Sequence, residues 1–239
     1  MIIVMCKMKE TLEKLNPKVI EKLNKFFSET FLVDSSEINY GHSTRFGILF
    51  EAMWGYYMKG ELETLGYMVK WICRNQYNDF YITDLLGNFI CNIEVKTLCL
   101  DSDESKSHFD ALQSELLDTD LLFVSAWKWD VHDDLMKPKI TESKFFVSKE
   151  IAVMRDELHI LRGGNFVKEE PINASGYRER LSGPDENKPP KVTHMANFGG
   201  LVRMLGTKSK TSKVKLQEYY DAGGTCKEYI DFVRYVKSS

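Results

Sequence analysis

Residues 77–98 read YNDFYITDLLGNFICNIEVKTL, and this stretch decides the fold that the sequence predicts. Aromatic and β-branched side chains are frequent in residues 80–82 and 89–95, as in two β-strands. The residues between them, Leu-Gly-Asn at 86–88, have the chemistry of a tight turn. The sequence therefore predicts a β-hairpin whose turn lies near Gly87.

Three charged residues come together in this hairpin. Paired residue numbers in a hairpin have a constant sum, so a turn near Gly87 brings Asp79 opposite Glu94 or Val95. Side chains alternate between the two faces of a strand, so Glu94 and Lys96 point to one face and Val95 to the other. The sequence predicts two acids and a lysine at one point of a sheet, with a reactive face and a core face.

The three residue types suggest metal-dependent chemistry. Mg²⁺ prefers hard oxygen ligands and is often held by one or two carboxylates together with substrate phosphate, which suits Asp79 and Glu94. A lysine beside such an ion can orient a water molecule and stabilise the charge that develops on a phosphate, which suits Lys96. The pattern favours a metal-dependent phosphodiesterase.

The tripeptide acid-x-Lys alone is weak evidence. It occurs four times, beginning at Glu94, Glu104, Glu142 and Glu186, about as often as chance predicts. The match at Glu94 differs in its context, because it lies in an apolar, β-rich run with a turn and an Asp upstream. The other three matches lie in polar sequence typical of loops.

Asp79, followed after fourteen residues by Glu94, Val95 and Lys96, resembles the PD-(D/E)xK nuclease superfamily. Asn78 stands where the motif has proline. The resemblance extends over roughly residues 44–127. It implies an α/β protein with a restriction-endonuclease-like core, in which helices flank a mixed central β-sheet.

The resemblance also implies a role for Glu51. In that superfamily the helix before the sheet often carries a further Glu that helps to hold metal or water, and residues 44–59 are the corresponding amphipathic helix here. Glu51 is thus a predicted catalytic residue and metal ligand. Asp84 is a rival for Asp79, but it would pair nearer the turn, away from Glu94.

Further elements follow from periodicity. Residues 9–31 predict a helix that breaks at Asn16-Pro17, where an N-cap would precede a proline at the first helical position. Residues 67–73 predict a first strand. Residues 109–117 predict a helix that crosses back over the sheet to a strand at 121–127, which would then be parallel to its neighbour.

Beyond residue 127 the predicted elements are shorter. Residues 129–141 suggest a long polar connection and 145–147 a short strand. Ser148 would cap a helix that stops at Gly163-Gly164, and 169–192 would be a long exposed loop. The chain would end in a helix whose capping box is formed by Thr225 and Glu228.

The composition indicates one folded domain, 1–239. Hydrophobic residues make up 43% of the 239 residues, and the net charge of −3 means that DNA binding needs a local basic surface. The segment 194–215 is the most basic part of the chain. The predicted DNA contacts are Arg203, Lys208, Lys210 and Lys213 there, and Arg45, beside His42, at the start of the second helix.

The sequence also bears on location. Five scattered cysteines, without a Cys-x-x-Cys pair, favour free thiols in a reducing compartment over a zinc site. The opening apolar residues are too few for a signal segment or a membrane span. We expect a cytoplasmic protein without a membrane partner.

These observations lead to one expected function and two alternatives. A stand-alone protein of this size, without helicase or methyltransferase motifs, is most similar within the superfamily to type II restriction endonucleases. The resemblance implies Mg²⁺-dependent, sequence-specific cleavage of double-stranded DNA by a homodimer. The alternatives are a structure-selective repair or recombination nuclease, and a non-catalytic DNA-binding or assembly protein in which Asp79, Glu94 and Lys96 form a structural cluster.

Overall fold

The computed structural model describes thirteen stretches of the chain, which form two compact units. The first unit comprises residues 1–74, 78–103 and 118–147, and the second comprises 75–77, 104–117 and 148–239. We describe each unit by itself. The described residues are 2–30, 33–34, 44–72, 78–101, 109, 111, 113–132, 135–161, 165–166, 177–181, 191–194, 217–224 and 226–238.

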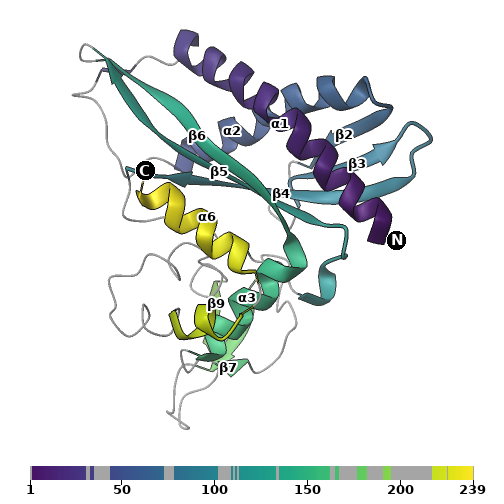
Figure 1. The fold of residues 1–239 in the computed structure, drawn as a ribbon, viewed down its shortest axis with the longest axis vertical. Helices are drawn as coiled ribbons and strands as arrows, with labels where there is room; N and C mark the ends of the chain where they lie inside the picture. Colours follow the sequence, from purple (N-terminus) through teal and green to yellow (C-terminus); the bar gives the residue numbers. More distant parts are fainter. Residues whose placement is uncertain are drawn as a thin grey trace. The chain divides into compact units, whose positions relative to one another are not determined.

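The first unit is an α/β structure built on a mixed sheet (Figure 1). Its six strands lie in the order β1-β6-β5-β4-β3-β2, and every pair is antiparallel except β4 and β5, which are parallel. The strands are β1 (Val33–Asp34), β2 (Tyr67–Trp71), β3 (Phe80–Asp84), β4 (Phe89–Cys99), β5 (Leu121–His132) and β6 (Leu135–Val147). The described residues of this unit also form two helices, α1 (Ile2–Thr30) and α2 (Thr44–Glu63).

The predicted hairpin is formed by β3 and β4. Phe80 pairs with Ile93, so the register continues to Glu94 opposite Asp79, one of the two predicted alignments. The turn is closed by a hydrogen bond from the Gly87 amide to the Asp84 carbonyl (3.1 Å), and Gly87 has a φ of 85°, which glycine adopts without strain. The register shifts once, between residues 82 and 83.

The first helix differs from its prediction, because α1 runs through Pro17 without a break. Asn16 is not an N-cap: its side chain is buried, accepts a hydrogen bond from Trp54 Nε1 (3.0 Å) and donates one to Ser143 Oγ (2.8 Å). Packing on both sides of Pro17 offsets the cost of proline in a helix. The side chains packed in this way are Met8, Leu12, Val19, Leu23 and Phe27.

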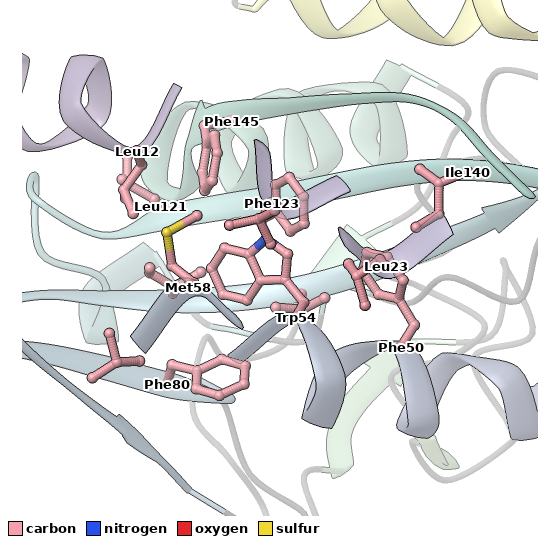
Figure 2. Close-up of a cluster of buried hydrophobic side chains, with 14 of the residues drawn as sticks. Leu12, Leu23, Phe50, Trp54, Met58, Phe80, Leu121, Phe123, Ile140 and Phe145 are labelled. Atoms are coloured by element: carbon pink, nitrogen blue, oxygen red, sulfur yellow. The ribbon is translucent and has the colours of Figure 1, made fainter. Parts of the chain in front are cut away.

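The core between the helices and the sheet is centred on Trp54 of α2 (Figure 2). Its ring lies 4.8 Å from Phe123 and 5.5 Å from Phe80, measured between centroids, and Phe123 stacks on Phe145 at 4.5 Å. A Cβ at Gly55 would lie 2.2 Å from Phe80, so glycine permits the close approach of α2 to β3. This packing holds α2 at a fixed position over the hairpin.

The predicted polar connection at 129–141 is wrong, because β5 and β6 pair along an antiparallel ladder from Leu121↔Val147 to His132↔Leu135, with one register shift between Ala126 and Trp127. Met136, Pro138 and Ile140 are buried and alternate with polar residues, a period of two. The backbone N–H and C=O of Ile140 bond to the Asn24 side chain of α1 at 2.8 and 3.0 Å. α1 therefore satisfies part of the β6 edge.

Two predictions that fall in the second unit, a helix at 109–117 and a loop at 169–192, differ from the structure. The described residues of the predicted crossover helix, 109–117, form only a 3-10 turn, η3 (Gln113–Glu115). Arg155 of α3 is fully buried and donates hydrogen bonds to the carbonyls of Phe109 (2.6 Å) and Ala111 (2.8 Å), which keeps those carbonyls out of a helical ladder.

Besides a helical segment at 217–221, the described residues of the second unit form two longer helices and a small sheet. They are α3 (Ser148–Leu161), α6 (Lys227–Ser238), and the antiparallel strands β7 (Asn165–Phe166), β8 (Tyr177–Leu181) and β9 (Lys191–His194), in the order β7-β8-β9. The predicted loop at 169–192 thus contains all of β8 and the start of β9. The predicted helix stop and Thr225 cap lie outside the described residues.

Candidate functional site

The predicted cluster lies where β3 begins beside β4. Asp79 directly precedes β3, and its amide donates to the Ile93 carbonyl at 3.0 Å. Its carboxylate accepts a hydrogen bond from the Val95 amide through Oδ2 at 2.7 Å. The side chain therefore takes the ladder position that a further strand residue would occupy, and it is anchored by backbone on both sides.

Glu94 is held from two directions. It is 7% exposed, its Oε2 accepts from the Asn78 amide at 2.9 Å, and its Oε1 forms an ion pair with Lys96 Nζ. Glu94 and Lys96 lie two residues apart on β4, on one face of the strand, as the alternation predicts. The lysine lies beside the acid pair with its side chain 22% exposed.

Asn78 is a functional candidate that the sequence did not reveal. It has a φ of 69°, in the left-handed region that asparagine tolerates better than most residues, and this turns its amide toward Glu94. Its Nδ2 also donates to Asn92 Oδ1 at 2.7 Å. Proline has no N–H and a φ fixed near −65°. The departure from the motif at this position therefore changes the backbone as well as the residue.

Glu51 approaches the cluster from α2. Its Oε1 accepts a hydrogen bond from Trp71 Nε1 of β2 at 2.7 Å, and Trp71 itself is 48% exposed. Burial raises the pKa of Glu51 and Glu94 adds to this, while the Trp71 hydrogen bond and the charge of Lys96 oppose it. Glu51 is near enough to Glu94 and Lys96 for their charges to act on its pKa, and its catalytic role stays a prediction.

Asp79 has the strongest electrostatic signature. Burial, followed by the negative charge of Glu94, raises the pKa of Asp79 to about 8, and Glu51 contributes in the same direction. Lys96 and the Val95 amide lower it only in part. Glu94 is buried and Asp79 is half-buried, and the charge of Lys96 offsets only part of the repulsion between them, so a cation bound beside both carboxylates would favour their ionised forms.

The donor set fits a magnesium site better than a zinc site. The described residues contain no group of three or more Asp, Glu, His or Cys side chains placed to hold a metal ion. Structural and catalytic zinc needs three or four protein ligands, whereas Mg²⁺ commonly takes one or two carboxylates and keeps several waters. Asp79 and Glu94 meet the second requirement. The predicted ligand role of Glu51 stays a prediction.

The predicted DNA contacts are mostly outside the described residues. Arg203, Lys208, Lys210 and Lys213 all fall there, as does His42. Arg45 lies in the first turn of α2, and only its backbone is described.

Trp71 and Asn78 are therefore the site residues that sequence reasoning missed. The signal for Asn78 was its place in the motif. No signal in the sequence pointed to Trp71, because its contact with Glu51 depends on how α2 packs against β2.

No family model matches the chain, and neither a curated protein nor a solved structure matches it. Among the described helices, none is long and apolar enough to cross a membrane.

Proposed function

We propose that the protein is a Mg²⁺-dependent endonuclease of the PD-(D/E)xK superfamily that cleaves double-stranded DNA at specific sequences, in the manner of a type II restriction enzyme. The observation that carries the proposal is the convergence of Asp79, Glu94 and Lys96 at the start of β3, where a buried and a half-buried carboxylate lie beside one lysine. This arrangement suits an ion and a phosphate better than it suits a structural core.

The order of elements supports the proposal. A helix (α2) is followed by a strand (β2), a hairpin (β3 and β4), and then a strand (β5) parallel to β4. This is the order of the restriction-endonuclease-like core, apart from the crossover helix, for which the described residues have a 3-10 turn. A restriction-endonuclease-like fold is part of the proposal.

The chemistry assigns each residue a role. Asp79 and Glu94 would hold the ion, and Lys96 would orient the attacking water and stabilise charge on the phosphate oxygens. Mg²⁺ bound there supplies charge neutralisation and lowers the pKa of a coordinated water. Glu51, positioned by Trp71, would assist from α2. The buried setting strengthens these interactions.

One observation favours a non-catalytic alternative. Lys96 and Glu94 form an ion pair, and both carboxylates accept backbone hydrogen bonds, which a purely structural cluster would also do. The two readings differ in what the lysine does. Removal of a structural partner lowers stability, whereas removal of a catalytic lysine abolishes cleavage even in a protein that is stably folded.

Incubation of long mixed-sequence duplex DNA with the purified chain, in Mg²⁺ or in EDTA, tests the proposal. We expect discrete fragments in Mg²⁺ only, no cleavage by Asp79→Ala, and a loss of about 10²–10³-fold or more in rate for Lys96→Ala. If linear duplexes stay intact and branched substrates are cleaved, the protein is instead a structure-selective nuclease.

The matched control is Lys22→Ala. Lys22 pairs at 2.5 Å with Glu61, another buried glutamate, on the helical layer. We expect it to keep full activity. The double variant Glu94→Gln/Lys96→Met removes both members of the ion pair, so it is expected to recover part of the stability that Lys96→Ala loses, without recovering cleavage. Cleavage by a folded double variant would favour the structural alternative.

A further inference from the structure

A row of side chains crosses the hairpin beside the candidate site. Tyr81 of β3 pairs with Lys70 of β2 on one side and with Asn92 of β4 on the other. The residues that flank Tyr81 and Asn92 on their strands, and Val69 beside Lys70, are buried in the core that faces α1 and α2, so the row occupies the opposite face. These buried neighbours are Val69, Phe80, Ile82, Cys91 and Ile93.

This is the face that carries Glu94 and Lys96. Asn92 precedes Glu94 by two residues on β4, a separation of about 7 Å along a strand. Asn92 is also tied to the site through its hydrogen bond with Asn78. The row therefore begins at Asn92, next to Glu94 on the same face of β4. From there it continues through Tyr81 to Lys70 on the edge strand β2.

Lys70 is a cation without an acidic partner among the described residues. It is exposed, and its Nζ lies 5.4 Å from the centroid of the Tyr81 ring. A cation over an aromatic face is attracted to it and loses mobility without losing its charge. An ordered positive charge thus lies on the same face as the acids.

We propose that Lys70 binds a backbone phosphate of the DNA strand adjacent to the phosphate that is cleaved, with the Tyr81 ring holding the ammonium in place. The proposal rests on the proposed function. Phosphate contacts fix the register of a nucleic acid on a protein, and lysine makes them as a point charge. Lys70 then acts as a positioning residue that sets where the substrate strand passes the acid pair.

The test is equilibrium binding of a fluorescent mixed-sequence duplex to the full chain, in EDTA to prevent cleavage, over a series of salt concentrations. A lysine that contacts phosphate releases about one counterion, so Lys70→Ala should weaken binding several-fold and lower the slope of log affinity against log salt by about one. Lys70→Arg should keep the slope. Tyr81→Ala should weaken binding, and Tyr81→Phe should not.

Lys139→Ala is the matched control, since this exposed strand lysine already pairs with Asp130 at 3.9 Å. Its slope should equal that of the wild type. If the wild type binds and cleaves DNA and Lys70→Ala changes neither affinity nor slope, the role of Lys70 is wrong and the nuclease proposal stands. If binding depends on Lys70 but no substrate is cleaved in Mg²⁺, the nuclease proposal fails and the phosphate contact stands. Absence of any DNA binding by the wild type overturns both.

Discussion

Asp79 is the residue at which burial and charge conflict most directly. Its carboxylate is anchored to the Val95 amide, yet burial and Glu94 raise its pKa to about 8. A cation bound beside Asp79, as proposed, would favour its ionised form. Metal binding should accordingly release a proton near neutral pH.

This conflict makes stability depend on pH in a defined direction. Between its ordinary pKa of 3.8 and the folded value of about 8, the folded chain binds more protons than the unfolded chain. The stabilisation is full below 3.8 and is lost as the pH rises through about 8. We expect the free energy of unfolding in EDTA to fall over this range for the wild type, and to fall less for Asp79→Asn.

Urea denaturation of both proteins at a series of pH values measures this difference. Mg²⁺ should reduce the difference in pH dependence between the wild type and Asp79→Asn, because the ion favours the deprotonated carboxylate. Parallel curves for the two proteins in EDTA would contradict the assignment.

The proximity of Asp79, Glu94 and Lys96 was predictable, because a hairpin turn and the alternation of side chains fix it. The left-handed backbone of Asn78 and the bond from Trp71 to Glu51 were not. Residue type alone does not determine a backbone torsion angle. A contact between a helix and an edge strand depends on how the whole layer of helices packs on the sheet.

Among the elements, α1 departs most clearly from local rules. Proline in a helix interior removes one hydrogen bond and costs about 3 kcal/mol. Here the chain retains Pro17 in a continuous helix because the stripe of buried side chains extends on both sides of it. Tertiary packing thus overrides the local signal.

Pro17→Ala should therefore stabilise the protein. We expect the free energy of unfolding to rise by roughly 1–3 kcal/mol, measured by urea denaturation, with unchanged cleavage. Ser28→Ala, at an exposed position of the same helix, should change the free energy of unfolding by less than about 0.7 kcal/mol. A loss of stability in Pro17→Ala would mean that the proline is accommodated without cost.

The same contrast separates the predicted elements from the missed ones. The hairpin, α2, β2 and the parallel strand β5 have strong periodicity or turn chemistry, and the structure confirms them. The strand β6 was predicted only at 145–147, because Pro138 argues against a strand interior even though Met136, Pro138 and Ile140 alternate with lysines. The helix expected at 109–117 had the right apolar spacing, but Arg155 takes two of its carbonyls.

At the scale of the whole molecule, charge is the main constraint on DNA binding. The net charge of −3 repels a polyanion, so affinity has to come from local basic groups. Four of the five predicted groups fall in the segment 194–215, outside the described residues, and the fifth, Arg45, lies in the first turn of α2. Lys70 would contribute on the first unit.

The basic segment should dominate the salt dependence. Substituting alanine for Arg203, Lys208, Lys210 and Lys213 together should lower the slope of log affinity against log salt by up to about four, with cleavage retained at low salt. A filter-binding series measures the slope. An unchanged slope would show that this segment does not contact DNA.

Light scattering on the same preparations would test the predicted homodimer.

The pleat of β4 makes the site unequally tolerant of changes in chain length. Residues added to the turn around Gly87 lengthen a loop and leave Glu94 and Lys96 on their face. A single residue added between Cys91 and Glu94 would reverse the side on which both emerge and would send them into the core. Over evolutionary time, homologous chains should therefore accumulate insertions and deletions at the tip of the hairpin and almost none along its second strand.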